Sequence, residues 1–286
     1  MNAALDGMVV LITGASGGIG RELARAFAAE GARLLLHAHT GLDRLEAFCE
    51  AEGFGEQARC ARADVRDPTA MEAVVQRGIE AFGRVDIAIA NAGRWPAEDQ
   101  ALDQASVERV QQTVEINLLG AAWTARAWMG GLRRLGPRPD ERGASLCFVG
   151  STAGRFGEAH HSDYAMAKAG LHGLMASLKN EVVRLDPYAR VNMVQPGWTV
   201  TEMAREALDE PGRIASVLRT MPLRQLASAR DIAQSVLFLS SPALARHISG
   251  EALTVAGGME GRLQWEPSQI DEDRVRRRVA KGEAGA

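Results

Sequence analysis

Short apolar runs alternate with longer segments of helical spacing along almost the whole sequence. The apolar runs occupy residues 8–12, 34–37, 57–63, 86–90, 145–150, 191–195 and 251–255. The helical segments between them include residues 18–30, 42–52, 68–82, 106–132 and 163–185. Runs that are apolar on both faces and separated by helices are typical of parallel strands covered on each side. The alternation therefore predicts an α/β fold with a doubly wound parallel sheet of about seven strands, flanked by helices.

The length and composition fit one large domain. The chain has 286 residues, of which 46% are apolar and 24% charged, so a sizeable core can form. Two stretches resemble linkers, residues 136–143 and the segment after Gly258, and neither divides the chain in two. We expect a single domain over residues 1–258 and a C-terminal extension over residues 259–286.

The charge balance argues against several classes of partner. The net charge is −3 and the pI about 6.1, so neither nucleic acid nor an anionic membrane is expected as a main partner. The first seven residues do not resemble a signal peptide, and no apolar stretch approaches the length of a membrane helix. The three cysteines, Cys49, Cys60 and Cys147, form no CxxC pair, which predicts buried apolar residues and no metal site. A cytoplasmic protein is expected.

A glycine-rich turn joins the first apolar run to the first helical segment. It reads Thr13-Gly14-Ala15-Ser16-Gly17-Gly18-Ile19-Gly20. Glycines in such a turn let the backbone approach a pyrophosphate, and the N–H groups at the start of the helix then face the phosphates. The spacing G-x-x-x-G-x-G differs from the more familiar G-x-G-x-x-G, and an ordinary glycine-rich turn is the alternative. Its place between strand and helix favours a Rossmann-like, dinucleotide-binding domain.

Two further strand ends agree with such a site. Asp64 and Val65 end the third run, where a carboxylate can accept from an adenine amino group. Asn91, Ala92 and Gly93 end the fourth, near the point where such sheets bind ligands. Each could instead be a turn or a cap.

Tyr164 and Lys168 are four residues apart on one predicted helix face, and Ser151 follows the strand just before them. A phenol has a pKa near 10, too high for a base at neutral pH. A lysine ammonium about 4 Å away contributes about 4 kcal/mol, enough to bring that pKa to about 7. Ser151 can polarise a substrate oxygen, so the set can support combined proton and hydride transfer. The alternatives are a solvated helix face for the Tyr–Lys pair and a helix cap for Ser151.

Asn117 lies inside a long predicted helix, where asparagine is a poor helix former. It is either a satisfied helix-interior amide or a local break in the helix that holds a water.

These motifs, in this order, resemble the short-chain dehydrogenase/reductase family over residues 6–258. The resemblance rests on the glycine turn, Asn91-Ala92-Gly93, Asn117, Ser151 and Tyr-x-x-x-Lys at 164–168. Pro196-Gly197-Trp198-Thr199-Val200-Thr201 is similar to the segment that holds the nicotinamide carboxamide, and residues 247–258 resemble the closing strand. The resemblance implies an NAD(P)(H)-dependent oxidoreductase with a catalytic tetrad of Asn117, Ser151, Tyr164 and Lys168. In it, Asn117 belongs to a proton relay through water, and Lys168 also binds the nicotinamide ribose.

The expected cofactor-binding set gathers these motifs at one edge of the sheet. It comprises Gly14, Ser16, Gly17, Gly18, Ile19, Gly20, His39, Thr40, Asp64, Val65, Asn91, Ala92, Gly93, Tyr164, Lys168, Pro196, Gly197, Thr199 and Thr201. The second strand ends in His37-Ala38-His39-Thr40, without the aspartate that NAD-preferring members usually carry and without the arginine frequent in NADP-preferring ones. A carboxylate there would repel a 2′-phosphate, whereas His39 and Thr40 can hydrogen-bond it. NADP(H) is therefore favoured, with NAD(H) possible.

The segment between Ser151 and Tyr164 must pass beside the reacting carbon, and it is rich in polar groups. Trp95, Ser151, Glu158, His160 and Trp198 are the expected substrate residues, although His160 could instead face solvent. A polar pocket favours a small hydroxy or oxo compound such as a sugar or polyol. The alternatives are a 3-oxoacyl thioester (carrier-protein) reductase and, more remotely, a non-catalytic dinucleotide-sensing module.

The helix after Ser162 is rich in small residues, and the resemblance implies a homodimer or homotetramer built through it and through segment 106–132. Ser268 to Asp271 form a possible capping box. The C-terminal extension is therefore expected to be either a short helix docked on a neighbouring subunit or a mobile tail.

Overall fold

The computed structural model describes residues 2–201, 212–223 and 225–261. The helix expected after Ser268 lies outside these residues. Seven parallel strands form the main sheet, in the order β3-β2-β1-β4-β5-β6-β9. They are β1 (Val9–Ile12), β2 (Arg33–Ala38), β3 (Ala58–Arg62), β4 (Ile87–Ala90), β5 (Ser145–Val149), β6 (Arg190–Pro196) and β9 (Ala252–Val255). The predicted sheet of about seven parallel strands is confirmed.

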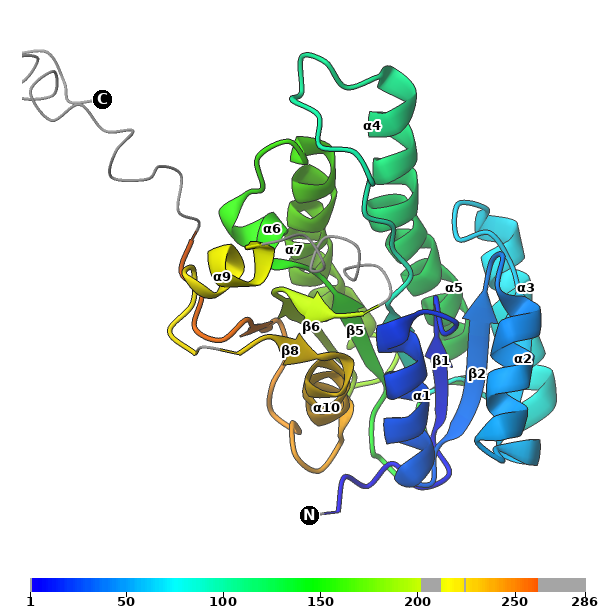
Figure 1. Cartoon of the computed structure of the whole chain (residues 1–286). Helices are drawn as coiled ribbons and strands as arrows, with labels where there is room; N and C mark the ends of the chain where they lie inside the picture. The colour runs from blue at the N-terminus through cyan, green and yellow to red at the C-terminus, as the bar shows by residue number, and fades with distance from the viewer. Residues whose placement is uncertain (1, 202–211, 224, 262–286) are drawn as a thin grey trace, which may run out of the picture.

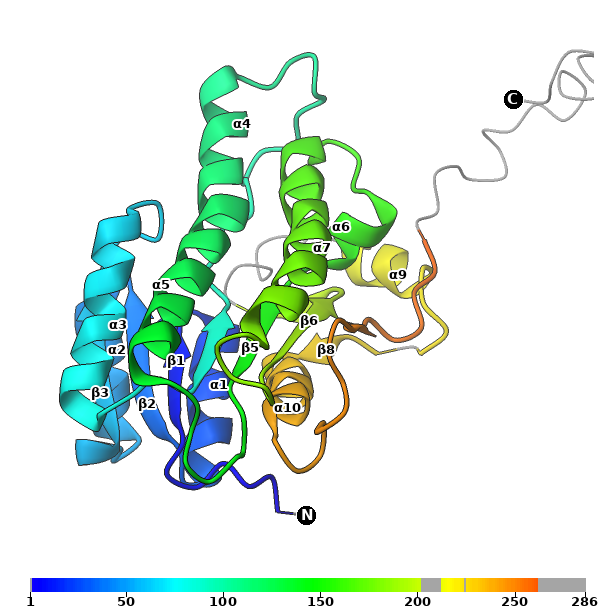
Figure 2. The same cartoon turned by 180° about the vertical axis from the view of Figure 1, so that it is seen from behind.

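Helices cover both faces of this sheet, as Figures 1 and 2 show from opposite sides. Those on one face are α1 (Gly18–Ala29), α2 (Leu42–Ala51) and α10 (Ala229–Ser240), and those on the other are α3 (Pro68–Phe82), α5 (Gly120–Leu135) and α7 (Ser162–Val182). Successive side chains of β1 serve the two cores in turn, with Val10 and Ile12 in one and Val9 and Leu11 in the other. This two-sided burial is why the strands read as continuous apolar runs.

Shorter elements complete the carboxyl edge of the sheet. They are α4 (Val107–Val114), η2 (Glu115–Leu119), α6 (Thr152–Phe156), α9 (Arg213–Leu218), and a two-stranded sheet of β7 (Thr199–Val200) and β8 (Ala227–Ser228). A short 3₁₀ turn, η1 (Gly55–Gln57), precedes β3. The small sheet did not appear in the sequence patterns, because two-residue strands carry no periodicity.

The long helix expected over residues 106–132 is interrupted. Its middle turn, η2, is a π-helix, and Asn117 lies in it, between α4 and α5. A π-helical turn opens the regular hydrogen-bonding ladder, often at functional sites. The predicted local break at Asn117 is therefore present in the backbone.

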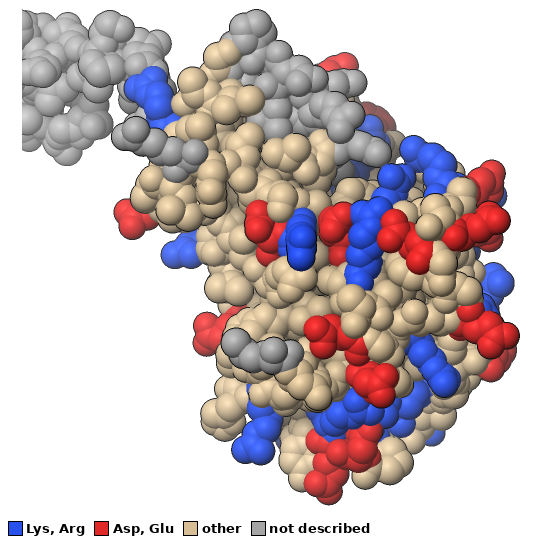
Figure 3. Space-filling model, turned by 60° about the horizontal axis from the view of Figure 1, so that its bottom comes forward, with Lys and Arg blue, Asp and Glu red and all other residues tan. Residues whose placement is uncertain are grey.

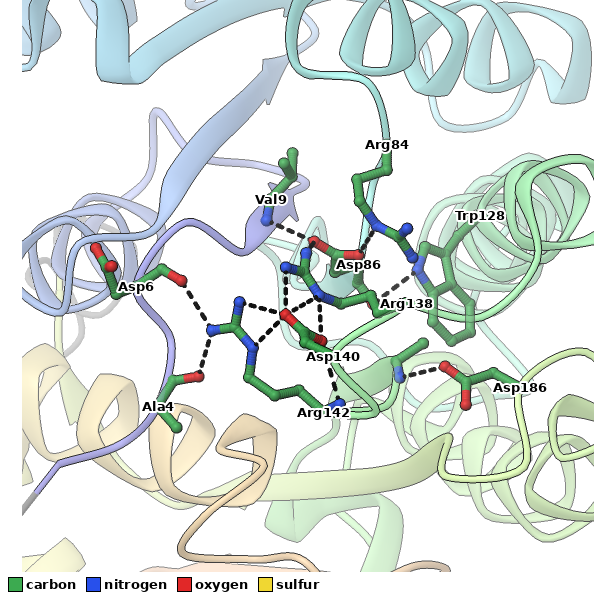
Figure 4. Close-up of polar contacts among 11 residues, drawn as sticks. Ala4, Asp6, Val9, Arg84, Asp86, Trp128, Arg138, Asp140, Arg142 and Asp186 are labelled. Carbon is green, nitrogen blue, oxygen red and sulfur yellow. Dashed lines mark hydrogen bonds and ion pairs between the residues drawn. The ribbon is translucent and has the colours of Figure 1, made fainter.

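The segment over residues 136–143, which reads as a linker, is fastened to the amino edge of the sheet (Figure 4). Arg138 donates to the buried carboxylate of Asp86 at 2.6 Å. Arg142 donates to the backbone carbonyls of Ala4 and Asp6 at 3.0 and 2.8 Å.

On the face that Figure 3 shows, basic and acidic side chains are interspersed.

The thiols of Cys49 on α2 and Cys60 on β3 lie 3.6 Å apart, and Cys147 is buried. The expectation that all three cysteines are buried is therefore wrong for Cys49 and Cys60, which are half-buried. Within the part of the chain that the structure describes, no helix is long and apolar enough to cross a membrane.

Candidate active site

The strand order reverses between β1 and β4, and the ends of these two strands are tied together. The Thr13 hydroxyl accepts from the backbone N–H groups of Asn91 and Ala92, each at 3.0 Å. The Asn91 amide donates in return to the Thr13 and Gly14 carbonyls at 2.8 and 3.2 Å. The glycine turn and the Asn-Ala-Gly turn therefore form one rigid unit at the switch point, where doubly wound sheets bind ligands.

The conformation of the glycine turn explains its first glycine. Gly14 has a φ of +65°, and a Cβ there would lie 2.9 Å from the Ala92 Cα. Gly17 at the start of α1 has no side chain to cap the helix, so the first N–H groups remain available to a ligand. These features fit a pyrophosphate.

A cavity of about 830 Å³ opens at this edge. It is lined by every residue of the expected cofactor set, and also by Trp95, Ser151, Glu158 and Trp198. A cavity of this size suits a dinucleotide with a small second ligand. His160 is exposed and outside the lining, so the structure does not place it beside the other expected substrate residues. It lies on an outward-facing turn, with a φ of +66°.

Three residues that the sequence analysis did not propose for the site lie close to expected cofactor residues at the end of the cavity near β2 and β3. They are His37, Arg66 and Arg44. Buried His37 accepts from the Gly14 N–H at 3.4 Å and donates to the Ala63 carbonyl at 3.0 Å. Burial lowers the pKa of this imidazole to about 4, so it supports the glycine turn as a neutral group.

Arg66, in the cavity wall, is the second of these residues. It pairs with Asp64 through contacts of 2.6–3.1 Å, and this hydrogen bonding lowers the pKa of that carboxyl. His39 lies 3.7 Å from the same carboxylate.

Arg44 on α2 is the third. Its Nη2 lies 3.2 Å from the point that a Gly41 Cβ would occupy, and the Ser16 Oγ lies 3.0 Å from the same point. A cation and a hydroxyl thus stand together beside the loop after β2. In the family that the motifs resemble, NADP-preferring members often carry an arginine at the position of His39, whereas Arg44 lies in the first turn of α2.

The proposed reacting groups meet at the other end of the cavity. Ser151 caps α6 by accepting from the Ala153 N–H at 3.1 Å, and it also hydrogen-bonds the Tyr164 phenol. The cap and the catalytic interpretation of Ser151 are thus compatible. The Lys168 ammonium is buried, donates to the Val149 carbonyl at 2.9 Å and lies 5.6 Å from the centroid of the Tyr164 ring.

The expected lowering of the phenol pKa is not what the structure shows. Burial raises the pKa of Tyr164 to about 12, although the bond to Ser151 acts in the opposite direction. Burial also lowers the pKa of Lys168 to about 8. The charge of Glu158 also raises the pKa of Tyr164, and neither burial nor this carboxylate can be judged from the spacing of Tyr164 and Lys168 in the sequence. Burial therefore favours the neutral form of the Tyr164 phenol.

Asn117 is buried and lies behind the cavity lining. Its amide donates to the Arg94 and Thr113 carbonyls at 2.9 and 3.0 Å, and its oxygen accepts from the Arg94 N–H at 3.1 Å. A Cβ on Gly93 would lie 2.8 Å from this oxygen and 3.4 Å from Lys168 Nζ. Glycine at position 93 therefore lets the turn pass between Asn117 and Lys168. Asn117 is therefore both an amide with satisfied hydrogen bonds and part of a local break in the helix.

Known proteins that are similar to this chain include dehydrogenases and reductases. A family model described as enoyl-(acyl carrier protein) reductase matches residues 14–260. L-rhamnose 1-dehydrogenase (NAD(P)(+)) of Sphingomonas sp. (strain SKA58) is 33% identical over 262 residues, 91% of this chain and 99% of that protein. 3-Oxoacyl-[acyl-carrier-protein] reductase FabG of Escherichia coli (strain K12) is 34% identical over 256 residues, 89% of this chain and 98% of that protein.

Solved structures agree. A short-chain dehydrogenase/reductase from Brucella melitensis, described as a glucose/ribitol dehydrogenase, superposes with a TM-score of 0.81 at 29% identity, covering 90% of this chain and 98% of that one. A short-chain dehydrogenase from Burkholderia cenocepacia J2315 in complex with NADP has a TM-score of 0.78 at 32% identity, with 89% and 98% covered.

Proposed function

The chain belongs to the short-chain dehydrogenase/reductase family and is an NAD(P)-dependent oxidoreductase, and we propose that it interconverts the carbonyl and alcohol forms of a small polar compound of sugar or polyol type. One observation carries the substrate class: beyond the tyrosine the cavity is lined by polar groups together with indole rings. The polar groups are those of Glu158, Arg94 and Gln112, and the indole rings are those of Trp95 and Trp198. Residues 1–258 are proposed to form the dinucleotide-binding and catalytic domain.

Tyr164 is proposed as the acid/base. In carbonyl reduction its neutral phenol donates a proton to the substrate oxygen while Ser151 hydrogen-bonds the same oxygen. The nicotinamide, when bound, supplies or takes the hydride. Lys168, charged below its pKa of about 8, stabilises the phenolate that forms. It would also hydrogen-bond the nicotinamide ribose. Asn117 holds the turn that carries Arg94 and stands behind Lys168, where a water-mediated proton relay would pass.

Cofactor preference is proposed to favour NADP(H). Arg44, Ser16, His39 and Thr40 gather positive charge and hydrogen-bond donors beside the adenosine end, and charge-assisted bonds to phosphate are the strong ones. Two relatives agree in part, since the rhamnose dehydrogenase is named for NAD(P)(+) and the Burkholderia cenocepacia structure is a complex with NADP.

We expect kcat/KM to be higher with NADPH than with NADH, and Arg44→Gln to lower the NADPH value about tenfold while leaving the NADH value unchanged. Paired steady-state kinetics and NADPH fluorescence titrations measure both. Arg134→Gln, which removes an exposed guanidinium of α5 bonded to Gln76, is the control. A tenfold preference of the unmodified protein for NADH would overturn the proposal.

The substrate proposal is tested at Glu158, which lines the cavity on the segment between Ser151 and Tyr164. Glu158→Ala should lower kcat/KM for sugars and polyols about tenfold, the cost of one lost hydrogen bond to a charged group, and leave a simple apolar ketone unaffected. Glu108→Ala, an exposed site on α4 outside the cavity, is the control. An equal effect on both substrate types, or none on either, would contradict a polar pocket.

Reduction of 3-oxoacyl thioesters is the second candidate, because the Escherichia coli reductase is as similar as the rhamnose dehydrogenase. A panel of aldoses, polyols and 3-oxoacyl thioesters, followed at the nicotinamide absorbance, separates the two. Turnover of the thioester alone would replace the sugar proposal.

We also propose a homodimer or homotetramer through α5 and α7. The small residues of α7 divide between two roles: Ala167 is buried and a Cβ at Gly170 would meet Leu118 at 2.8 Å, whereas Ala169, Gly173 and Ala176 are exposed. The packing of the chain on itself therefore accounts for only some of them, and an exposed small-residue face permits close approach of another helix. A dimer or larger mass is expected in light scattering at micromolar concentration, and a monomer would contradict this assembly.

A further inference from the structure

A second aromatic ring supports the substrate wall from outside the cavity. The Trp95 ring lies edge-on to Tyr164, with 4.8 Å between centroids and an interplanar angle of 71°. The His161 imidazole lies 3.9 Å from the same indole, tilted by 40°. Trp95 lines the cavity, whereas His161 is only 3% exposed and does not line it. His161 is therefore placed to influence the substrate through Trp95.

The contacts of His161 determine its tautomer. Nε2 lies 2.9 Å from Asp99 Oδ1, and an ionised carboxylate can only accept, so Nε2 must carry a proton. Nδ1 lies 3.4 Å from Arg109 Nη2, and a guanidinium can only donate, so Nδ1 must accept. A neutral imidazole protonated at Nε2 satisfies both partners. Turning the ring over would place donor against donor at Arg109.

Arg109 on α4 fastens the surrounding loops. It donates to the Glu98 carbonyl at 2.7 Å and to the His160 carbonyl at 3.1 Å, and its Nε donates to buried Asp163 at 3.1 Å. One guanidinium thus joins the loop that carries Trp95, the loop that carries His161, and the first turn of α7 just before Tyr164.

We propose that His161 is a positioning residue that holds the Trp95 indole against Tyr164, so that the indole can pack on the apolar face of a small hydroxylated substrate. The inference rests on the proposed function for the nature of the substrate, whereas the fixed position of Trp95 is a property of the protein alone. Without the imidazole, Trp95 keeps one ring contact instead of two, and the indole spends less time in the position that completes the wall.

Neighbouring residues offer a matched set of variants. His161→Leu removes the ring, His161→Phe keeps a ring but removes both hydrogen bonds, and His160→Leu changes the exposed neighbour. Asp99 is 70% exposed and Arg109 retains the His160 carbonyl, so His161→Leu leaves neither charge buried alone. We expect His161→Leu to raise the KM for the sugar or polyol substrate up to about tenfold, which is the usual contribution of an aromatic contact. kcat and NADPH affinity should change less than twofold.

His161→Phe should recover most of the loss in KM, and His160→Leu should match the unmodified protein. Recovery by a ring without hydrogen bonds separates positioning of the indole from a general effect of the polar network. Loss of NADPH affinity or of thermal stability in proportion to KM would show a merely structural role and overturn the proposal.

A double-mutant cycle tests whether His161 acts through Trp95. In a Trp95→Ala background, His161→Leu should change KM by less than about 1.5-fold, because the indole that it positions is gone. Additive effects of the two substitutions would overturn the inference.

A readout that needs no substrate keeps this test separate from the proposed function. The emission of Trp95 is the difference between the protein and its Trp95→Phe variant, and its quenching by acrylamide reports exposure of the indole. His161→Leu should increase that quenching, and His160→Leu should not. If no sugar or polyol is turned over, the proposed function fails while quenching still decides the position of Trp95. Unchanged quenching would overturn the inference even in an active enzyme.

Discussion

Replacing Tyr164 with phenylalanine should lower kcat about 10²- to 10⁴-fold, the usual contribution of a general acid, without weakening NADPH binding. The substitution removes one hydroxyl that hydrogen-bonds Ser151 and leaves the ring, with its edge contact to Trp95, in place. The glycine turn is held by Thr13 and Asn91 at the other end of the cavity, so cofactor affinity should change little although Tyr164 belongs to the expected cofactor set. Stopped-flow or steady-state reduction, paired with NADPH fluorescence titration, measures both quantities.

The pH profile and a second variant serve as controls for this assignment. Tyr164, with a pKa of about 12, stays protonated, whereas Lys168 loses its charge as the pH rises through about 8. The reduction rate should therefore be level below pH 8 and fall above it, since a neutral lysine no longer stabilises the phenolate. Lys168→Met should abolish this fall in rate above pH 8 and should also weaken NADPH binding. Near-native turnover by Tyr164→Phe would show that another group donates the proton.

The parts of the site that the sequence predicted are those whose chemistry is local. The glycine turn between strand and helix, and the four-residue spacing of Tyr164 and Lys168, follow from the chain itself. Parallel strands bring all their carboxyl ends to one edge, so residues just after predicted strands can be assigned to one cavity from the sequence alone. All the expected cofactor residues line it.

What the sequence missed depends on contacts between distant segments. The sequence alone does not distinguish His160 from its neighbour His161. Only the packing shows that His161 is buried against Trp95, whereas His160 faces outward. The phenol pKa differs from the expected one for a related reason: attraction between two charges can be judged from spacing, but desolvation depends on the burial of both groups. Arg44 approaches Ser16 only because α2 folds back beside the glycine turn.

Asp86, at the amino edge of the sheet, anchors the structure far from the reacting groups. Its carboxylate is fully buried and accepts from the Val9 N–H at 3.0 Å, from Arg138 at 2.6 Å, and from Arg84 (Figure 4). Its backbone carbonyl accepts from the Trp128 indole at 3.3 Å. One residue thus joins β1, β4, α5 and the loop before β5. The side chains of Arg84 and Arg138 are only 19% and 12% exposed, and this carboxylate compensates both charges, that of Arg138 together with Asp140.

Asp86→Ala should therefore destabilise the protein by about 3–5 kcal/mol, because it leaves the largely buried Arg84 guanidinium and the Val9 N–H without this acceptor, and Arg138 with Asp140 as its remaining carboxylate. For a chain of this size that corresponds to a fall in Tm of about 6–20 °C. Asp140→Ala is the matched control: its carboxylate binds Arg138 and Arg142, each at 2.8 Å, but is 40% exposed, so the loss should cost about 1 kcal/mol or less for each pair. kcat of the folded Asp86→Ala protein, measured well below its Tm, should stay within about twofold, since Tyr164 and Lys168 lie at the opposite edge of the sheet.

A Tm of Asp86→Ala unchanged within about 2 °C would mean that water or neighbouring groups replace the carboxylate. A large loss of kcat in the fully folded variant would mean that the two edges of the sheet are coupled.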